Sequence, residues 1–218
     1  MSSTTVSLDE QSRFYRIKMI RSRAKNGLLL LTLRNAVMRL GIDIDPYWIC
    51  REGLDLCPDP PGIKDDSRLY EMRKIDDTII REQYTLMGWS TSDLDQTLAL
   101  DHLSYGLYRE DELTAFMIAR INQYVFKDKT FKLKPHEAYL GGMYTFEKFR
   151  GRSLAPFLRF KCYEILAKDG YTTFYSITQY FNRSSARFKE KLNGSNQGLF
   201  LYLGLFRKLN FTLTLRKK

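Results

Sequence analysis

The sequence has 218 residues, 44% hydrophobic and 14% aromatic, which is enough for one sizeable core and excludes global disorder. Its formal net charge of +10 favours anionic partners such as nucleic acid, phosphorylated cofactors or an anionic membrane surface. Three cysteines without a CxxC pair argue against a disulfide framework or a zinc knuckle, and two histidines without paired spacing predict no metal site.

The N-terminal sequence, MSSTTVSLDEQ, lacks the form of a signal peptide. The longest apolar run, residues 28–33, is far too short to span a lipid bilayer. We therefore expect a cytoplasmic protein that is either free or peripheral to a membrane.

Residues 13–40 form a basic segment without any acidic residue. Its apolar residues recur at a spacing of three or four, which predicts a helix with Gly27 as a break and Gly41 as its stop. The basic residues are Arg13, Arg16, Lys18, Arg21, Arg23, Lys25, Arg34 and Arg39, and the apolar stripe is Ile17, Ile20, Ala24, Leu28 and Leu31.

Three roles for the basic helix stay open. It can pack its apolar stripe on the main domain, or lie on an anionic membrane surface and bring the protein to a lipid-linked partner. Nucleic-acid binding ranks lowest, because the sequence has no RNP-like, KH-like or zinc-finger motif beside the clustered charge.

A joint follows the basic helix. The prolines and glycine of residues 58–62 can neither continue a helix nor sit in a central strand. They predict a boundary between an N-terminal basic helical extension with its linker, residues 1–68, and a main domain, residues 69–218. We expect residues 46–49, Pro-Tyr-Trp-Ile, to anchor the extension to that domain.

The main domain mixes strand and helix patterns. A helix begins near Asp77 or Thr78, a longer amphipathic one is closed by Asp169-Gly170, and a third is capped by Asn182 or Ser184. This order predicts an α/β fold with one β-rich sheet and helices between hairpins. The expected strands are 69–75, 103–108, 113–121, 138–146, 172–178, 199–206 and 209–215, with a hairpin turn at 109–112; the expected helices are 77–87, 154–168 and 182–192.

The loop at residues 150–153, Arg-Gly-Arg-Ser, lies between a predicted strand and a predicted helix. The free N–H groups of a helix start, with the positive end of its dipole, form a ready anion site. Gly151 and Ser153 are small enough for a pyrophosphate to approach the backbone, and Arg150 and Arg152 add positive charge. The loop therefore predicts a phosphate site.

Residues 140–155 resemble motif A of the GNAT superfamily of acyl-CoA-dependent N-acyltransferases. In that family a strand with a Gly-Gly-apolar pattern runs into Arg/Gln-x-x-Gly-x-Gly/Ala and a long helix, and Arg150, Ser153 and Ala155 occupy the signature positions. Residues 175–192 resemble the family's next strand and its Asn-x-x-Ala/Ser helix. The resemblance implies a GNAT fold, with a mixed, mostly antiparallel sheet flanked by helices.

The resemblance also implies that acyl-CoA is the donor. The loop amides would bind the CoA pyrophosphate, and free backbone groups of the preceding strand would pair with pantetheine, one of them polarising the thioester carbonyl. Two residues after the next strand would contact the CoA arm. The implied CoA-binding residues are Met143, Thr145, Arg150, Gly151, Arg152, Ser153, Leu154, Ala155, Asn182 and Ser185.

Catalysis by direct attack of a neutral amine needs a proton acceptor, because such an amine has a pKa of about 10.4. Glu137 is the first candidate, ahead of His136 and His102. The family's usual acid, a tyrosine, aligns with Lys189, so Tyr180, Tyr144 and Tyr175 are the candidate substitutes. A CoA thiolate can also leave without a dedicated acid.

The sequence thus predicts an N-acyltransferase that moves an acyl group from CoA to a primary amine. The acyl group is acetyl by default or a longer chain, and the acceptor is an amino sugar or a peptide side chain. The alternative is a non-catalytic module of the same fold that binds an anionic partner, and Lys189 is its best support.

Overall fold

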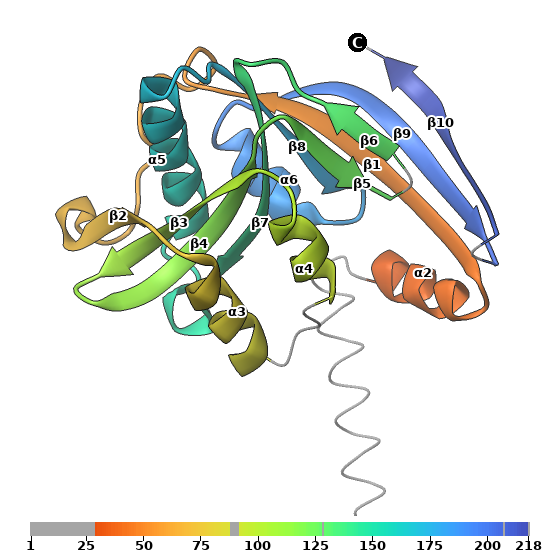
Figure 1. The fold of residues 1–218 in the computed structure, drawn as a ribbon, viewed down its shortest axis with the longest axis horizontal. Coiled ribbons are helices and arrows are strands. Elements are labelled where there is room, and N and C mark those ends of the chain that lie inside the picture. The colour runs from red at the N-terminus through yellow and green to blue at the C-terminus, as the bar shows by residue number, and fades with distance from the viewer. Residues whose placement is uncertain (1–28, 88–91, 128, 207, 218) are drawn as a thin grey trace, which may run out of the picture.

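The computed structural model of the protein describes residues 29–87, 92–127, 129–206 and 208–217. Its centre is a twisted sheet with helices packed against it, and a small separate hairpin (Figure 1). The helices are α2 (Leu29–Arg39), α3 (Asp77–Leu86), α4 (Ser92–Leu98), α5 (Leu154–Lys168) and α6 (Arg183–Glu190). The strands are β1 (Ile42–Glu52), β2 (Tyr70–Lys74), β3 (His102–Arg109), β4 (Glu112–Arg120), β5 (Gln123–Phe126), β6 (Lys129–Lys132), β7 (Glu137–Thr145), β8 (Thr173–Gln179), β9 (Ser195–Leu205) and β10 (Leu209–Lys217).

The main sheet has eight strands in the order β10-β9-β1-β8-β7-β4-β3-β2, and β5 pairs with β6 in a sheet of two. Neighbouring strands of the main sheet are antiparallel, except that β7 and β8 run parallel. This mixed, mostly antiparallel sheet with flanking helices confirms the predicted fold class.

Both faces of strand β4 are buried, which explains its nearly continuous apolar sequence. Ala115, Met117 and Ala119 belong to the hydrophobic cluster that includes α5. Phe116 and Ile118, on the other face of β4, belong to the cluster that includes Ile80 of α3 and Leu94 of α4. Each fully buried side chain of this size contributes about 1.5–3 kcal/mol to folding. The core therefore holds α5 on one face of the sheet and α3 with α4 on the other.

The predicted helices after residue 150 and the predicted hairpin are confirmed as α5, α6 and the β3–β4 pair. Asp76 occupies the N-cap position of α3 without a side-chain capping hydrogen bond, so the predicted caps Asp77 and Thr78 lie inside the helix. Of the basic segment, residues 29–39 are helical as predicted, and residues 13–28 lie outside the described part. No helix of the described residues is long and apolar enough to cross a membrane.

Strand β1 lies in the middle of the sheet, between β8 and β9. Tyr47 pairs with Gln179 of β8 on one side and Phe200 of β9 on the other. The division of the chain at residue 68 stays a prediction, but this part of the predicted extension is a component of the central sheet. The predicted anchor, residues 46–49, lies within β1.

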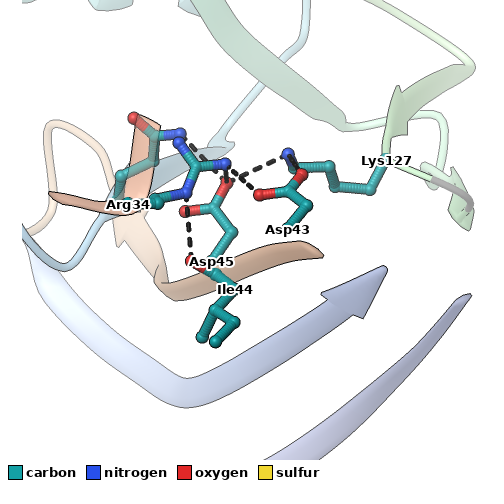
Figure 2. Close-up of polar contacts among 6 residues, drawn as sticks. Arg34, Asp43, Ile44, Asp45 and Lys127 are labelled. Atoms are coloured by element: carbon teal, nitrogen blue, oxygen red, sulfur yellow. Dashed lines mark hydrogen bonds and ion pairs between the residues drawn. The ribbon is translucent and has the colours of Figure 1, made fainter. Parts of the chain in front are cut away.

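The sequence pattern of β1 does not predict a strand. Two acidic residues, Asp43 and Asp45, and Pro46 interrupt its apolar residues. Figure 2 shows how the charges are balanced. Arg34 of α2 contacts Asp43 at 2.6 Å and Asp45 at 2.9 Å, and Lys127 contacts the same carboxylates at 2.7 and 3.2 Å. The network also ties α2 and the β5–β6 turn to β1.

The short elements α4, β5 and β6 were not predicted. Five charged or polar residues in seven break the pattern of α4, and the two strands of the hairpin have only four residues each. Aromatic contacts hold the hairpin against the main sheet. The ring of Tyr124 stacks on that of Tyr139 of β7 with centroids 4.0 Å apart, and the ring of Phe126 makes an edge contact with Tyr47 of β1 with centroids 4.7 Å apart. Its stability comes from tertiary contacts that short-range patterns do not report.

Candidate functional site

A wedge opens between the two parallel strands at the centre of the sheet. β7 and β8 pair only from Glu137–Thr173 to Tyr139–Tyr175. Beyond that point a bulge places Gly142 and Met143 of β7 opposite Met117 of β4, and Gly142 has φ +50°. The bulge bends β7, so its backbone between residues 143 and 145 faces an opening that a ligand can enter.

The loop after β7 turns sharply into α5. Gly151 has φ +79° and Ser153 has φ +64°, and α5 begins at the next residue, Leu154. Residues of alternating hand direct successive N–H groups to one side, which forms an anion-binding concavity. In the described part of the chain, the N–H groups of Gly151, Arg152 and Ser153 donate no backbone hydrogen bond. The predicted phosphate loop therefore has the required backbone geometry.

The end of β7 and the loop border one cleft of about 780 Å³, and no residue of β8 is among its described lining residues. Nine of the predicted site residues line it: Met143, Tyr144, Thr145, Arg150, Gly151, Ser153, Leu154, Ala155 and Ser185. The remaining lining residues, which sequence analysis missed, are Lys64, Phe149, Pro156, Ser184, Arg187, Phe188 and Lys191.

The cleft is electrostatically suited to phosphate. Lys64, Arg150, Arg187 and Lys191 line it, and no carboxylate is among its described lining residues. A neighbouring cleft of about 890 Å³, between α3 and the β3–β4 turn, shares Tyr144 and Phe149 but carries three acidic residues, Asp111, Glu112 and Glu147, beside one cation, Lys148. The lining of the smaller cleft therefore suits an anion better than the lining of the larger one.

The two predicted arginines of the loop are already paired. The guanidinium of Arg150 donates to the carbonyl of Thr145 at 3.1 Å, to Glu147 at 3.1 Å and to the hydroxyl of Tyr144 at 2.9 Å. Arg152 donates to Asp65 at 2.8 Å, and that hydrogen bond raises the pKa of Arg152. Direct phosphate contacts by either arginine stay a prediction.

Helix α6 forms the other wall of the cleft. The side chain of Asn182 accepts a hydrogen bond from the N–H of Ser185 at 3.1 Å, which confirms Asn182 as the N-cap. Ser185 lines the cleft, whereas Asn182 does not. Ser184, Phe188 and the C-cap residue Lys191 recur at a spacing of four and three, so this side of α6 and its cap could have been predicted from the sequence.

Lys189, which we predicted to occupy the position of the family's tyrosine, is not among the described lining residues of the cleft. It is buried, its ammonium donates to the hydroxyl of Thr178, and it lies 3.9 Å from Glu52. Burial lowers the pKa of Lys189, opposed by the charge of Glu52.

The candidate catalytic residues do not converge. Glu137 lies six positions before Met143, about 20 Å along an extended strand, and accepts from the N–H of Lys134 at 2.9 Å. Tyr180 is 52% exposed and stacks on Trp48. Tyr144 is the one of the three that lines the cleft among its described residues.

The other titratable candidates are also away from the cleft lining. His136 is exposed in the turn just before β7, and His102 pairs with Asp77 of α3 at 2.8 Å. Tyr175 places its hydroxyl 3.4 Å from Glu137. The catalytic roles of these residues and of Tyr180 stay predictions that proximity does not support.

The geometry agrees with a comparison against known families. Residues 69–194, more than half of the chain, match the family described as the acetyltransferase (GNAT) family. The chain belongs to the GNAT acetyltransferase family. The match begins after the linker, so Lys64 and all of β1 lie outside the matched residues.

Solved GNAT structures share the fold at low sequence identity. A GNAT-family protein from Novosphingobium aromaticivorans has 20% identity and a TM-score of 0.50, covering 76% of this chain and 66% of that one. A GNAT acetyltransferase from Colwellia psychrerythraea has 15% identity and a TM-score of 0.52, covering 76% and 57%. A tandem GNAT protein of clavulanic acid biosynthesis has 11% identity and a TM-score of 0.52, covering 81% and 55%.

This chain thus spans about two thirds or less of the length of these GNAT structures. No curated protein sequence matches it. Membership of the GNAT family implies an acyl-CoA donor. Among the described residues, no group of three or more His, Cys, Asp or Glu side chains is placed to hold a metal ion.

Proposed function

We propose that this protein is an N-acetyltransferase that moves an acetyl group from acetyl-CoA to a primary amine. The observation that carries the proposal is the cleft itself. It joins the open edge of β7 to a loop with left-handed Gly151 and Ser153, and four cations line it without a carboxylate among the described lining residues.

In this proposal the donor lies along the wedge. Those N–H groups of residues 151–155 that make no hydrogen bond within α5 bind the pyrophosphate. The backbone of Met143 and Thr145 pairs with pantetheine. The N–H near Met143 faces the thioester carbonyl and stabilises the oxyanion that forms during attack. Ser185 contacts the arm from α6, and Asn182 holds that wall through its capping hydrogen bond.

The reaction is direct transfer. The amine nitrogen forms a bond to the carbonyl carbon, the carbon–sulfur bond breaks, and CoA leaves as the thiolate. Tyr144 is the proposed acid, because it lines the cleft and its hydroxyl already accepts a hydrogen bond from Arg150. Glu137 stays the proposed proton acceptor, but about 20 Å of strand separates it from Met143, which is beyond direct contact or a single bridging water.

The acceptor we propose is an amino sugar or a peptide side-chain amine, and a longer acyl group remains an alternative donor. The second candidate function is a non-catalytic GNAT module that binds an anionic partner. One observation favours it: Lys189, where the family has its tyrosine, points into a buried ionic cluster.

We expect calorimetric titration of the full-length protein to show micromolar binding of CoA and acetyl-CoA, with palmitoyl-CoA as the test of chain length. Ser153→Val should weaken CoA binding at least tenfold, because a β-branched residue disfavours φ +64°.

Ser153→Gly is the matched control and should bind CoA as tightly as the wild type, since glycine adopts this conformation freely. A folded protein that binds none of the three ligands would overturn the proposal. Binding without release of CoA thiol in the presence of glucosamine or a lysine peptide would favour the non-catalytic module.

A further inference from the structure

We propose that the linker before the family domain completes the acyl-CoA site. Lys64 contacts the 3′-phosphate of CoA, and Asp65 is a positioning residue that holds the phosphate loop. The inference rests on the proposed function, and it concerns residues that precede the matched region, 69–194.

The linker is joined to the loop through the backbone. The N–H of Lys64 donates to the carbonyl of Arg152 at 3.1 Å. Arg152 lies between the two left-handed residues, Gly151 and Ser153. This hydrogen bond therefore fixes the peptide group at the centre of the turn, on which the direction of the loop's N–H groups depends.

A second tie runs through side chains. One carboxylate oxygen of Asp65 accepts from Arg152 at 2.8 Å and from the hydroxyl of Tyr70 at 2.5 Å, with Arg109 at 3.8 Å. The hydrogen bonds from Tyr70 and Arg152 lower the pKa of Asp65. Asp65 thus keeps Arg152 out of the described cleft lining and joins the loop to β2.

Lys64 itself faces the cleft. In the described part of the chain, Lys64, Arg187 and Lys191 have no ion pair with a carboxylate, and the ammonium of Lys191 lies 3.2 Å from the hydroxyl of Ser153. Three unpaired cations therefore surround the start of α5 from the linker and from α6.

The phosphates of CoA carry enough negative charge to pair with all three cations. Its pyrophosphate and its 3′-phosphate together carry roughly four negative charges at neutral pH. The loop amides can hold the pyrophosphate, which leaves the side-chain cations for the 3′-phosphate. The cleft should then distinguish CoA from 3′-dephospho-CoA, and Lys64 should be part of that selectivity.

The test is calorimetric titration of full-length variants with CoA and 3′-dephospho-CoA. We expect the wild type to bind CoA at least tenfold more tightly than 3′-dephospho-CoA. Lys64→Ala should weaken CoA binding about tenfold and leave 3′-dephospho-CoA nearly unchanged, and Lys64→Arg should restore most of the difference. Lys208→Ala, at the β9–β10 turn, removes the same charge outside the cleft and should change neither affinity.

Asp65→Asn should weaken both ligands several-fold through the loop. If Asp65 acts through Arg152, the double variant Asp65→Asn/Arg152→Gln should lose no more CoA affinity than either single variant. In acetyl-CoA kinetics the change should appear in KM rather than in kcat.

The outcomes separate the two proposals. A folded wild type that binds neither ligand overturns the proposed function and this inference with it. If the wild type binds CoA and Lys64→Ala has the same affinities as Lys208→Ala, the role of Lys64 is overturned and the proposed function is not. Asp65→Asn that lowers the melting temperature but keeps CoA affinity overturns the positioning role.

Discussion

Glu52 is a buried carboxylate with two cationic neighbours. It is fully enclosed, accepts from the hydroxyl of Tyr163 at 2.5 Å and from Ser176, and lies 3.6 Å from Arg159 and 3.9 Å from Lys189. Burial is the largest single influence and raises the pKa of Glu52, but the charges of Arg159 and Lys189 together with the hydrogen bonds from Ser176 and Tyr163 leave that pKa lowered. Glu52 therefore neutralises a site where α5 and α6 each bury a cation.

Glu52→Gln should cost about 3–5 kcal/mol of unfolding free energy, because it leaves two buried cations without an anion. Urea denaturation measures the loss. Lys189→Met is the matched control: it leaves Glu52 with Arg159 alone and should cost clearly less. Equal stability of Glu52→Gln and the wild type would show that the cluster needs no anion.

The same substitution has a pH signature. Since the folded pKa of Glu52 is lowered, its contribution is present above the unfolded value of about 4.3 and is lost as pH falls through the folded pKa. Glu52→Gln should therefore flatten the fall of stability below about pH 4.3.

Strand β7 carries the bend on which the cleft depends. Gly142 has φ +50°, and a Cβ there would lie 3.1 Å from the side chain of Ile118. The glycine thus permits both the bulge and close packing on β4. Without the bulge, β7 would continue alongside β8 and close the wedge.

Gly142→Ala should cost about 1–2 kcal/mol of stability, because an alanine is strained at this φ. It should also weaken acetyl-CoA binding, since the backbone of residues 143–145 follows the bulge. Calorimetry and urea denaturation measure the two effects. Gly62→Ala is the control, because a Cβ at that position meets no atom within 4 Å. Unchanged affinity in a destabilised Gly142→Ala would separate the bulge from the ligand site.

The whole molecule is organised around β1. This strand pairs with β8 and β9, carries Glu52, and through Asp43 and Asp45 holds α2 and the β5–β6 turn. The family match leaves out this strand, yet β9 and β10 reach the rest of the sheet only through it in the described topology. The fold of this protein is therefore larger than the matched region.

A truncated chain of residues 69–218 should fail to fold cooperatively, because it exposes the edge of β8 and leaves Arg159 and Lys189 without Glu52. Thermal unfolding followed by circular dichroism tests this. Adding a peptide of residues 29–68 should restore a cooperative transition in part. A truncated chain that unfolds cooperatively and binds CoA would instead establish the predicted boundary at residue 68.

Features with a local cause could be predicted from the sequence. The apolar run of α5, the closing Asp169-Gly170, the cap Asn182 and the loop at 150–153 each depend on residues a few positions apart. The GNAT resemblance rests on the same local pattern. The sequence by itself therefore determined the fold class, the family and the wall of the cleft that β7, its loop and α5 form.

Only the tertiary structure decided which distant residues meet. Lys64 lines the cleft because its N–H donates a hydrogen bond to the carbonyl of Arg152. Lys189 is buried beside Glu52 of β1, a residue that is far from it in the sequence. Asp43 and Asp45 are tolerated in a central strand because Arg34 and Lys127 neutralise them. Such contacts depend on strand order and on charge balance in a buried site, and neither leaves a periodic signal between neighbouring residues.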